Sequence, residues 1–185
     1  MSAQATPQTA TSTWNIDPVH SAAEFKVKHM MISNVKGHFT GLKGVLTLDE
    51  NDVTKSRVEG TIDVSTITTR EPQRDAHLRS AEFFDVEKFP TMSFQSKLIT
   101  REGDGELVVS GDLIIHGVTR EVEFTVEGPT PPGKDPWGNT RLGASATTKI
   151  SRKDFGLNYN AALETGGILI GDEVTITVEV EFVKA

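Results

Sequence analysis

The strongest constraint on the fold of this chain is an alternation of apolar and polar residues near its C-terminal end. Val174, Ile176, Val178, Val180 and Phe182 share one face of an extended strand, and the threonines and glutamates between them share the other face. A period of two predicts a β-strand with one buried face and one solvated face. Because the same period recurs in several other segments, the chain must build and enclose a large apolar surface.

About eight or nine such segments follow one another with mostly short connections, which favours an antiparallel β-barrel. Gly37, Gly41 and Gly44 interrupt two of these segments, and glycine inside a strand often marks a bulge or a bend where a sheet curls over. Ala144 and Ala146 are small residues at inward positions, so they leave volume unfilled. Barrels of this kind either fill their lumen with side chains or hold one small ligand.

The alternation stops between residues 69 and 80, where we expect one short helix. Pro72 fits the first helical turn, because the N–H group that proline lacks is not needed there. We predict that residues 69–84 form a movable cover over the barrel. The helix carries a basic run that either faces solvent or meets the polar end of a ligand, namely Arg70, Arg74, His77 and Arg79.

The length of 185 residues suits one domain. We divide the chain into a disordered N-terminal tail, residues 1–12, and a barrel domain, residues 13–185. The 19 basic and 26 acidic residues give a net charge of −7, which argues against nucleic acid as a partner. The chain has no cysteine, which excludes disulfides, thiolate metal sites and cysteine nucleophiles.

No run approaches the roughly 18 apolar residues of a membrane-spanning helix, so we do not expect the chain to span a membrane. The first twelve residues have neither the basic start nor the apolar core of a signal peptide. The sequence therefore predicts a cytoplasmic protein. A periplasmic location is the alternative if a signal sequence has been removed.

Catalytic and metal-binding patterns are weak. The five histidines form no closely spaced ligand pair, so we predict no metal site and no obligatory cofactor. There is no Gly-x-Ser-x-Gly motif of the serine hydrolases. Asp85 and Glu87 lie beside phenylalanines, where a carboxyl group could act as a general acid, although a tether for the loop after the helix is the simpler interpretation.

Several longer motifs follow one another along the chain in a fixed order. They are WNID (14–17) with His20-Ser21, RDAHLRSAEFFD (74–85) with Phe89-Pro90 and Phe94, GDLIIHGVTR (111–120), SRKDFG (151–156) with Asn160, and LETGG (163–167) leading to GDEV (171–174).

Together these motifs resemble the YceI-like polyisoprenoid-binding family, from about residue 13 to the C-terminus. The resemblance implies an all-β fold, an extended eight-stranded antiparallel lipocalin-like β-barrel with one short helix. It also implies an apolar lumen that takes a long isoprenoid chain, and it supplies no catalytic residues. Burial of about 0.8 kcal/mol per CH₂ would let such a chain bind tightly with few polar contacts.

The alternating strands and the cover predict which residues meet the ligand, although a one-residue slip in register would reverse a face. His29 ends a strand on its apolar face and, with Arg74 and His77, is expected to contact a polar headgroup. The residues expected on the apolar wall are Phe25, Val27, Phe39, Ile62, Leu78, Phe83, Phe84, Phe94, Leu113, Phe124, Ala146, Phe155, Ile176 and Val178.

The leading hypothesis is a non-catalytic protein that binds, stores or transports a long-chain polyisoprenoid lipid, either an isoprenoid quinone or a polyprenyl compound. This lipid is the expected partner, and the sequence leaves a homodimer open. The alternative is a barrel enzyme that modifies such a lipid with His29, His77 or Asp85. A third interpretation is an interaction domain whose core is filled.

Overall fold

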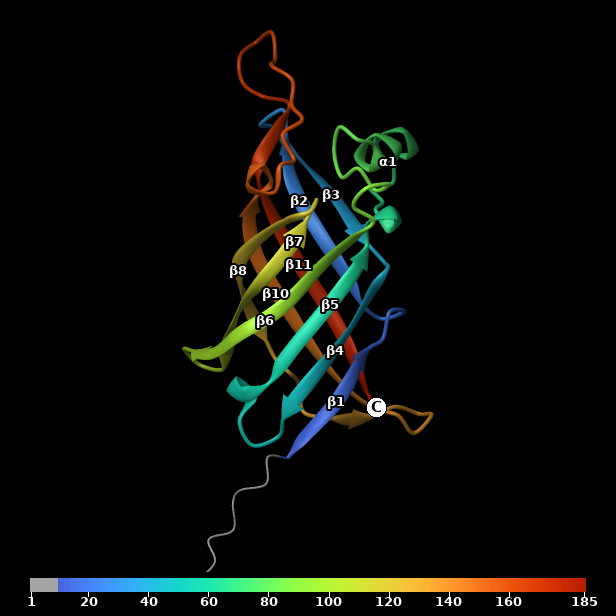
Figure 1. The fold of residues 1–185 in the computed structure, drawn as a ribbon, viewed down its shortest axis with the longest axis vertical. Coiled ribbons are helices and arrows are strands. Elements are labelled where there is room, and N and C mark those ends of the chain that lie inside the picture. The colour runs from blue at the N-terminus through green and yellow to red at the C-terminus, as the bar shows by residue number, and fades with distance from the viewer. Residues whose placement is uncertain (1–9) are drawn as a thin grey trace, which may run out of the picture.

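The computed structural model describes residues 10–185, and these fold mainly into one antiparallel sheet that closes on itself (Figure 1). The predicted tail lies largely outside the described residues, but its boundary at residue 12 is wrong, because the first strand already begins at Thr11. The strands are β1 (Thr11–Ile16), β2 (Ala22–His29), β3 (Ser33–Phe39), β4 (Leu42–Asp49), β5 (Arg57–Asp63), β6 (Thr91–Glu102), β7 (Glu106–Ile115), β8 (Val118–Glu127), β9 (Gly133–Lys134), β10 (Thr140–Ser151) and β11 (Ile170–Lys184).

Eight of these strands close the barrel, in the order β11-β1-β4-β5-β6-β7-β8-β10 and back to β11. β1 and β2 both pair with β11, β1 near residue 182 and β2 between residues 170 and 179. β3 pairs with β2 and leads into β4, so β2 and β3 lengthen the wall at one end. The predicted eight-stranded antiparallel barrel is therefore confirmed. We call the end with β2, β3 and the helix the upper end, as in Figure 1, and the opposite end the lower end.

A packed cluster occupies the lower end. Trp14, Leu46, Leu142 and Phe182 are buried against one another, and they come from strands β1, β4, β10 and β11. The Trp14 indole nitrogen Nε1 donates a hydrogen bond of 2.8 Å to Ser12 Oγ, so the ring is both buried and satisfied. This cluster ties the first and last strands of the barrel together.

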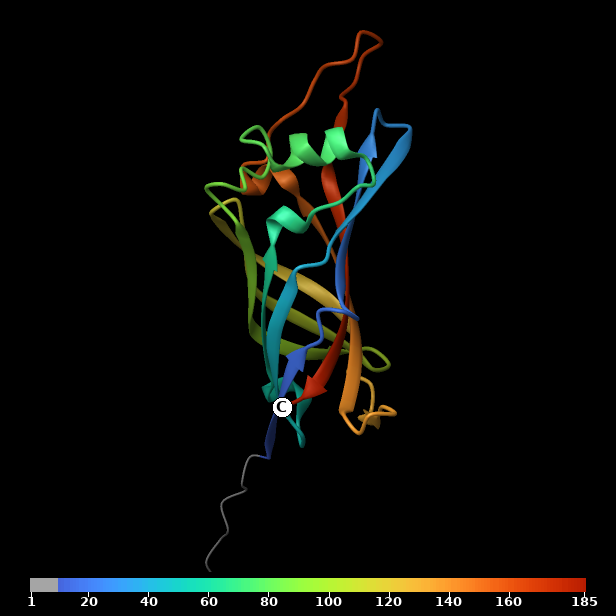
Figure 2. The ribbon, with the colours of Figure 1, turned by 90° about the vertical axis from the view of Figure 1, so that its right-hand side faces the viewer.

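A close approach between neighbouring strands explains one of the glycines in the predicted strands. Gly37 on β3 is the cross-strand partner of Phe25 on β2, and a Cβ atom at Gly37 would lie 2.4 Å from the Phe25 ring. The ring therefore covers the glycine, an arrangement that pins the register of a strand pair. Gly41 lies between β3 and β4, where the wall changes direction (Figure 2).

The predicted short helix is α1 (Pro72–Arg79), which lies across the upper end (Figure 2). Glu71 caps it by accepting hydrogen bonds from the backbone N–H groups of Gln73 and Arg74. The remaining helical turns are the 3₁₀ segments η1 (Val53–Lys55), η2 (Val64–Thr66) and η3 (Arg152–Phe155).

Side chains of α1 fasten it to the wall. Asp75 is buried and accepts hydrogen bonds from the Thr69 N–H and hydroxyl groups. Burial acts to raise the pKa of Asp75, but these hydrogen bonds outweigh it and hold the pKa below its ordinary value. Arg79 donates to the carbonyl oxygens of Ser65 and Ile67 at 2.9 and 2.7 Å. The cover is thus anchored along the edge formed by residues 65–69.

Candidate functional site

A cavity of about 470 Å³ runs inside the barrel. Side chains from all eight barrel strands, from β2 and β3, and from the α1 segment line it, and most of them are apolar. The volume lies within the usual range of small-molecule sites, about 300–1,000 Å³. The predicted unfilled lumen is therefore present, and the interpretation as a filled core is not supported.

The wall of the cavity differs between its two ends. Lining residues such as Leu46 at the lower end and Phe83 at the upper end are buried, but Val27, Leu78 and Val174, near the β2–β3 hairpin and α1, are only half-buried. We therefore infer that the cavity opens at the upper end, among α1, the β2–β3 hairpin and the segment that precedes β11.

Aromatic rings form much of the apolar wall. Phe39 lies 5.8 Å from Phe25 and 5.9 Å from Phe84 between ring centroids, which joins β3, β2 and the segment after α1. Phe94 and Phe124 meet at 5.2 Å on β6 and β8. Tilted and edge-to-face pairs at these separations are favourable and carry no polar group. The wall can therefore enclose hydrocarbon but offers it no directional contact.

A second aromatic group sits where the cover meets the opposite rim. His77, Phe83 and Tyr159 lie pairwise 4.8 to 4.9 Å apart between ring centroids, and all three line the cavity. His77 Nε2 donates to Glu82 Oε2, so one polar atom of this group is already engaged. The group joins α1 to the segment before β11 without a covalent or ionic link.

Two arginines also reach the cavity. Arg74 donates from Nε to Thr69 Oγ1 at 2.7 Å and from Nη2 to the Thr69 carbonyl oxygen at 3.1 Å. Arg152 is buried and donates at 2.6 to 2.8 Å to the carbonyl oxygens of Leu157, Tyr159 and Gly171. Burial lowers the pKa of the Arg152 guanidinium, which Asp172 partly counteracts, but arginine stays protonated in proteins.

Arg152 and Tyr159 were not predicted as cavity residues. Charged residues are almost never fully buried unless they are paired, so a lone arginine in a loop motif gives no signal of this position. Asn160 adds a second clamp, since its side-chain amide donates to the Ile170 carbonyl oxygen at 2.8 Å and accepts from the Ile170 N–H at 3.0 Å. Together these residues hold the segment before β11 against the barrel.

The structure brings together nearly all of the predicted site. Thirteen of the fourteen predicted wall residues and all three predicted headgroup residues line the cavity. Phe155 does not, because η3 turns its ring into the packed cluster beside the lumen, where it is 1% exposed. Asp85 and Glu87, the candidate general acids, also do not line the cavity. Whether the lining residues contact a ligand remains a prediction.

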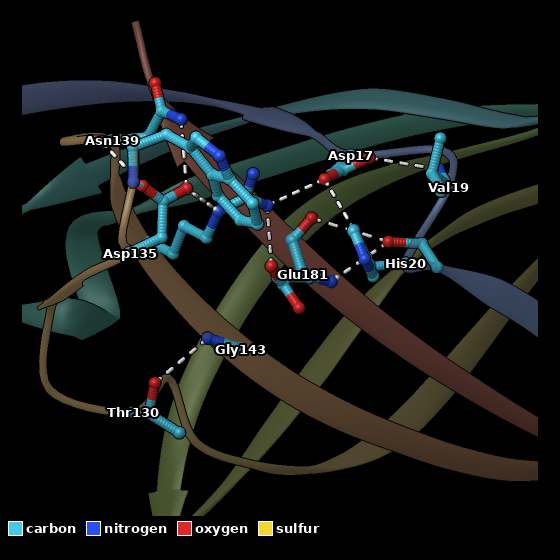
Figure 3. Close-up of polar contacts among 11 residues, drawn as sticks. Asp17, Val19, His20, Thr130, Asp135, Asn139, Gly143 and Glu181 are labelled. Atoms are coloured by element: carbon cyan, nitrogen blue, oxygen red, sulfur yellow. Dashed lines mark hydrogen bonds and ion pairs between the residues drawn. The ribbon is translucent and has the colours of Figure 1, made fainter.

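A polar cluster joins the β1–β2 connection, the loop before β10, and β11 (Figure 3). Arg141 Nη1 is 2.7 Å from Asp17 and 2.6 Å from Glu181, and its Nε is 2.7 Å from Asp135. Arg141 first, and then His20, hold the pKa of Asp17 well below its ordinary value, and Arg141 does the same for Asp135. The three carboxylates in turn raise the pKa of Arg141.

Asp17, His20 and Glu181 are close enough to share a metal ion. The Arg141 guanidinium, however, already contacts both carboxylates and balances their negative charge. We therefore read this cluster as a structural clasp that joins the β1–β2 connection, the loop before β10, and β11. None of the helices within residues 10–185 is long and apolar enough to cross a membrane.

A closed antiparallel barrel with an internal apolar cavity defines the class of lipocalin-like barrels. The family model for the YceI-like domain matches residues 14–182, and the chain belongs to this family. The UPF0312 protein SA2479 of Staphylococcus aureus is 37% identical over 170 residues, which cover 91% of this chain and 96% of that protein.

Solved structures show the same fold. The Campylobacter jejuni YceI protein is 29% identical, with a TM-score of 0.71 over 86% of this chain and 91% of that one. Burkholderia cenocepacia BcnA has a TM-score of 0.76 at 20% identity, over 90% and 98% of the two chains. A polyisoprenoid-binding domain from Saccharophagus degradans has a TM-score of 0.68 at 15% identity, over 93% and 98%.

Proposed function

We propose that this protein binds a long-chain polyisoprenoid lipid in the barrel lumen, for storage or transport and without chemical change. The observation that carries the proposal is the continuous apolar cavity inside a closed barrel. The structural neighbour from Saccharophagus degradans, which is described as a polyisoprenoid-binding domain, supports this ligand class.

The shape of the lumen favours a chain over a compact ligand. The fifteen residues of β11 span roughly 50 Å when extended, so the barrel is long relative to its cavity volume. Each buried CH₂ contributes about 0.8 kcal/mol, and a prenyl chain offers many of them along one line. Association costs several kcal/mol, which such a chain can exceed through apolar burial alone.

The polar residues at the upper end are suited to a headgroup. His29, Arg74 and His77 line the cavity there, and Arg74 has guanidinium donors in addition to the two that bind Thr69. A ligand whose apolar chain lies inside would place its oxygen-bearing end at this rim. An isoprenoid quinone or a polyprenyl compound fits this arrangement, and weak headgroup selectivity is expected because few polar groups converge.

The decisive experiment is organic extraction of protein purified without detergent, followed by mass spectrometry of the extract. A stoichiometric, chemically intact prenyl lipid supports the proposal. A modified prenyl lipid would support the alternative of a barrel enzyme that uses His29 or His77. An extract without any lipid, together with no uptake of an added prenyl alcohol, would contradict both functions.

The proposal includes no obligatory metal. Treatment with a chelator is expected to leave both the midpoint of urea unfolding and prenyl-lipid binding unchanged, because Arg141 already satisfies Asp17 and Glu181. Elemental analysis that found one tightly held metal ion per chain would overturn this part.

A further inference from the structure

The turn between β2 and β3 is apolar and lies at the upper end, beside the loop before β11, which extends farther (Figures 1 and 2). Met30, Met31 and Ile32 form it, and the Met31 and Ile32 side chains are 68% and 80% exposed. Met30 and Met31 have φ angles of 50° and 59°, a region that favours glycine or asparagine in such turns. Bulky apolar residues are therefore retained at positions where both solvent exposure and backbone conformation disfavour them.

This tip adjoins the inferred opening of the cavity. The Met30 N–H donates to the Leu169 carbonyl oxygen at 2.7 Å, and His29 pairs with Ile170 at the start of β11. His29, Leu169 and Ile170 all line the cavity. Ile168, another exposed apolar residue, lies next to them in the chain. The exposed apolar surface thus begins where the apolar lumen ends.

The outer face of the same hairpin is basic. Lys26, Lys28 and Lys36 are exposed and outnumber Glu24, the one acidic residue of the hairpin, and Lys26 lies directly opposite Lys36 in the strand pairing. Lys28 also borders the cavity. Like charges in this position are destabilising. None of the three lysines forms an ion pair with a residue between 10 and 185. The chain as a whole carries a net charge of −7, so the positive charge on this face is opposite in sign to the net charge of the chain.

The nearest acidic residues on β11 do not neutralise this face. Asp172 is 3.1 Å from Lys153, and Glu173 is 3.5 Å from Lys149. Each carboxylate is therefore matched by a lysine outside the hairpin, which leaves the hairpin lysines available to an external anion.

We propose that the β2–β3 hairpin docks on a lipid bilayer that contains anionic lipids. The tip residues would insert among the upper acyl chains, about 5–10 Å deep, while the three lysines meet the headgroups. An exposed apolar tip next to exposed lysines suits an anionic bilayer, because the apolar side chains can enter it while the lysines stay among its headgroups, whereas a protein partner would need a matching cleft. Docking extends the proposed function, because it would bring the lumen opening to a lipid surface, yet it can be tested separately.

The test is co-flotation of the full chain with vesicles of phosphatidylcholine, with or without phosphatidylglycerol. The protein should float with the anionic vesicles, and less so at high salt. Ile32→Asp should lower the partition about tenfold, because it places a charge among apolar groups. Val19→Asp is the matched control, since Val19 is 82% exposed but lies away from the tip. Lys26→Gln and Lys36→Gln should each lower binding to anionic vesicles about fivefold.

Uptake of farnesol from vesicle-free solution separates docking from lumen binding. Ile32→Asp should retain farnesol uptake, whereas Ala146→Trp, which narrows the lumen, should lose it and still float with vesicles. Wild-type protein that does not float, or equal losses in Ile32→Asp and Val19→Asp, would overturn the docking proposal and leave lumen binding intact. A dimer that Ile32→Asp dissociates, without vesicle binding, would show instead that a second copy covers the tip.

Discussion

The two ends of this barrel use similar residues in different ways. At the lower end, side chains such as Trp14 and Leu142 pack against each other until they are fully buried. At the upper end, apolar residues such as Phe25 and Ile176 remain half-buried around the cavity. The upper end also contains a buried cluster, around Ile67 and Phe155, so the contrast lies between the packed clusters and the half-buried residues that keep apolar surface available around the cavity.

The largest expected effect comes from breaking the lower end. Trp14→Ala should reduce the free energy of unfolding by about 3–5 kcal/mol, because it leaves a cavity in a packed cluster. Ile176→Ala should cost only about 1 kcal/mol, since one side of this residue already faces open volume. Urea unfolding measures both. If the two variants lose equal stability, the distinction between the packed cluster and the cavity wall is incorrect.

A smaller loss of stability is expected when the hydrogen bonds that hold α1 to Thr69 are removed. Asp75→Ala removes the acceptor of two hydrogen bonds from Thr69 and should destabilise the α1 segment by about 2 kcal/mol. Amide exchange in residues 72–84 should become faster, while exchange in β7 and β10 changes little. Added prenyl lipid should slow exchange in this segment of the wild-type protein if the cover closes over the ligand. Identical exchange with and without lipid would identify α1 as a fixed cap.

The lumen itself can be tested with little change in stability. Ala146→Trp should lower prenyl-lipid affinity by about tenfold, because displacing about two CH₂ groups already costs that much. Thr147→Trp is the matched control, since the next residue on β10 points to solvent. Equal affinity of the two variants, measured by titration with a prenyl alcohol, would place the ligand elsewhere.

The smallest effect is expected from the Arg141 clasp. Arg141→Ala should lower the melting temperature by about 2–4 °C at pH 7, with lipid binding unchanged. The pKa values of Asp17 and Asp135 are lowered in the folded state, so this contribution is present above their unfolded pKa of about 3.9. It is lost as the pH falls below that value. The difference between variant and wild type should therefore shrink between pH 5 and about pH 2; a constant difference would contradict this.

Local patterns were sufficient for the barrel and most of its wall. The period of two assigns Ile176 and Val178 to the inner face, because alternation is set by the backbone and needs no knowledge of distant contacts. The prediction that Phe155 lies on the cavity wall was wrong, because this residue lies in a 3₁₀ turn, where the period of two does not apply.

Features that depend on distant segments could not be read from the sequence. Arg141 gathers carboxylates from positions 17, 135 and 181, and the pattern around each of them is unremarkable. Arg152 is likewise defined by carbonyl oxygens that only the folded loop brings together. The sharing of β11 by β1 and β2 also arises from tertiary pairing alone.

The position of β11 bears on how the protein is made. This strand pairs with β1, β2 and β10, yet it follows all of them in the chain. At 5–20 residues per second, a ribosome needs roughly 10–35 s to pass from β1 to the end of β11, and during that time the strands wait with unpaired edges. The nascent chain is therefore exposed to aggregation late into its synthesis, and the lumen is enclosed only after β11 has been translated.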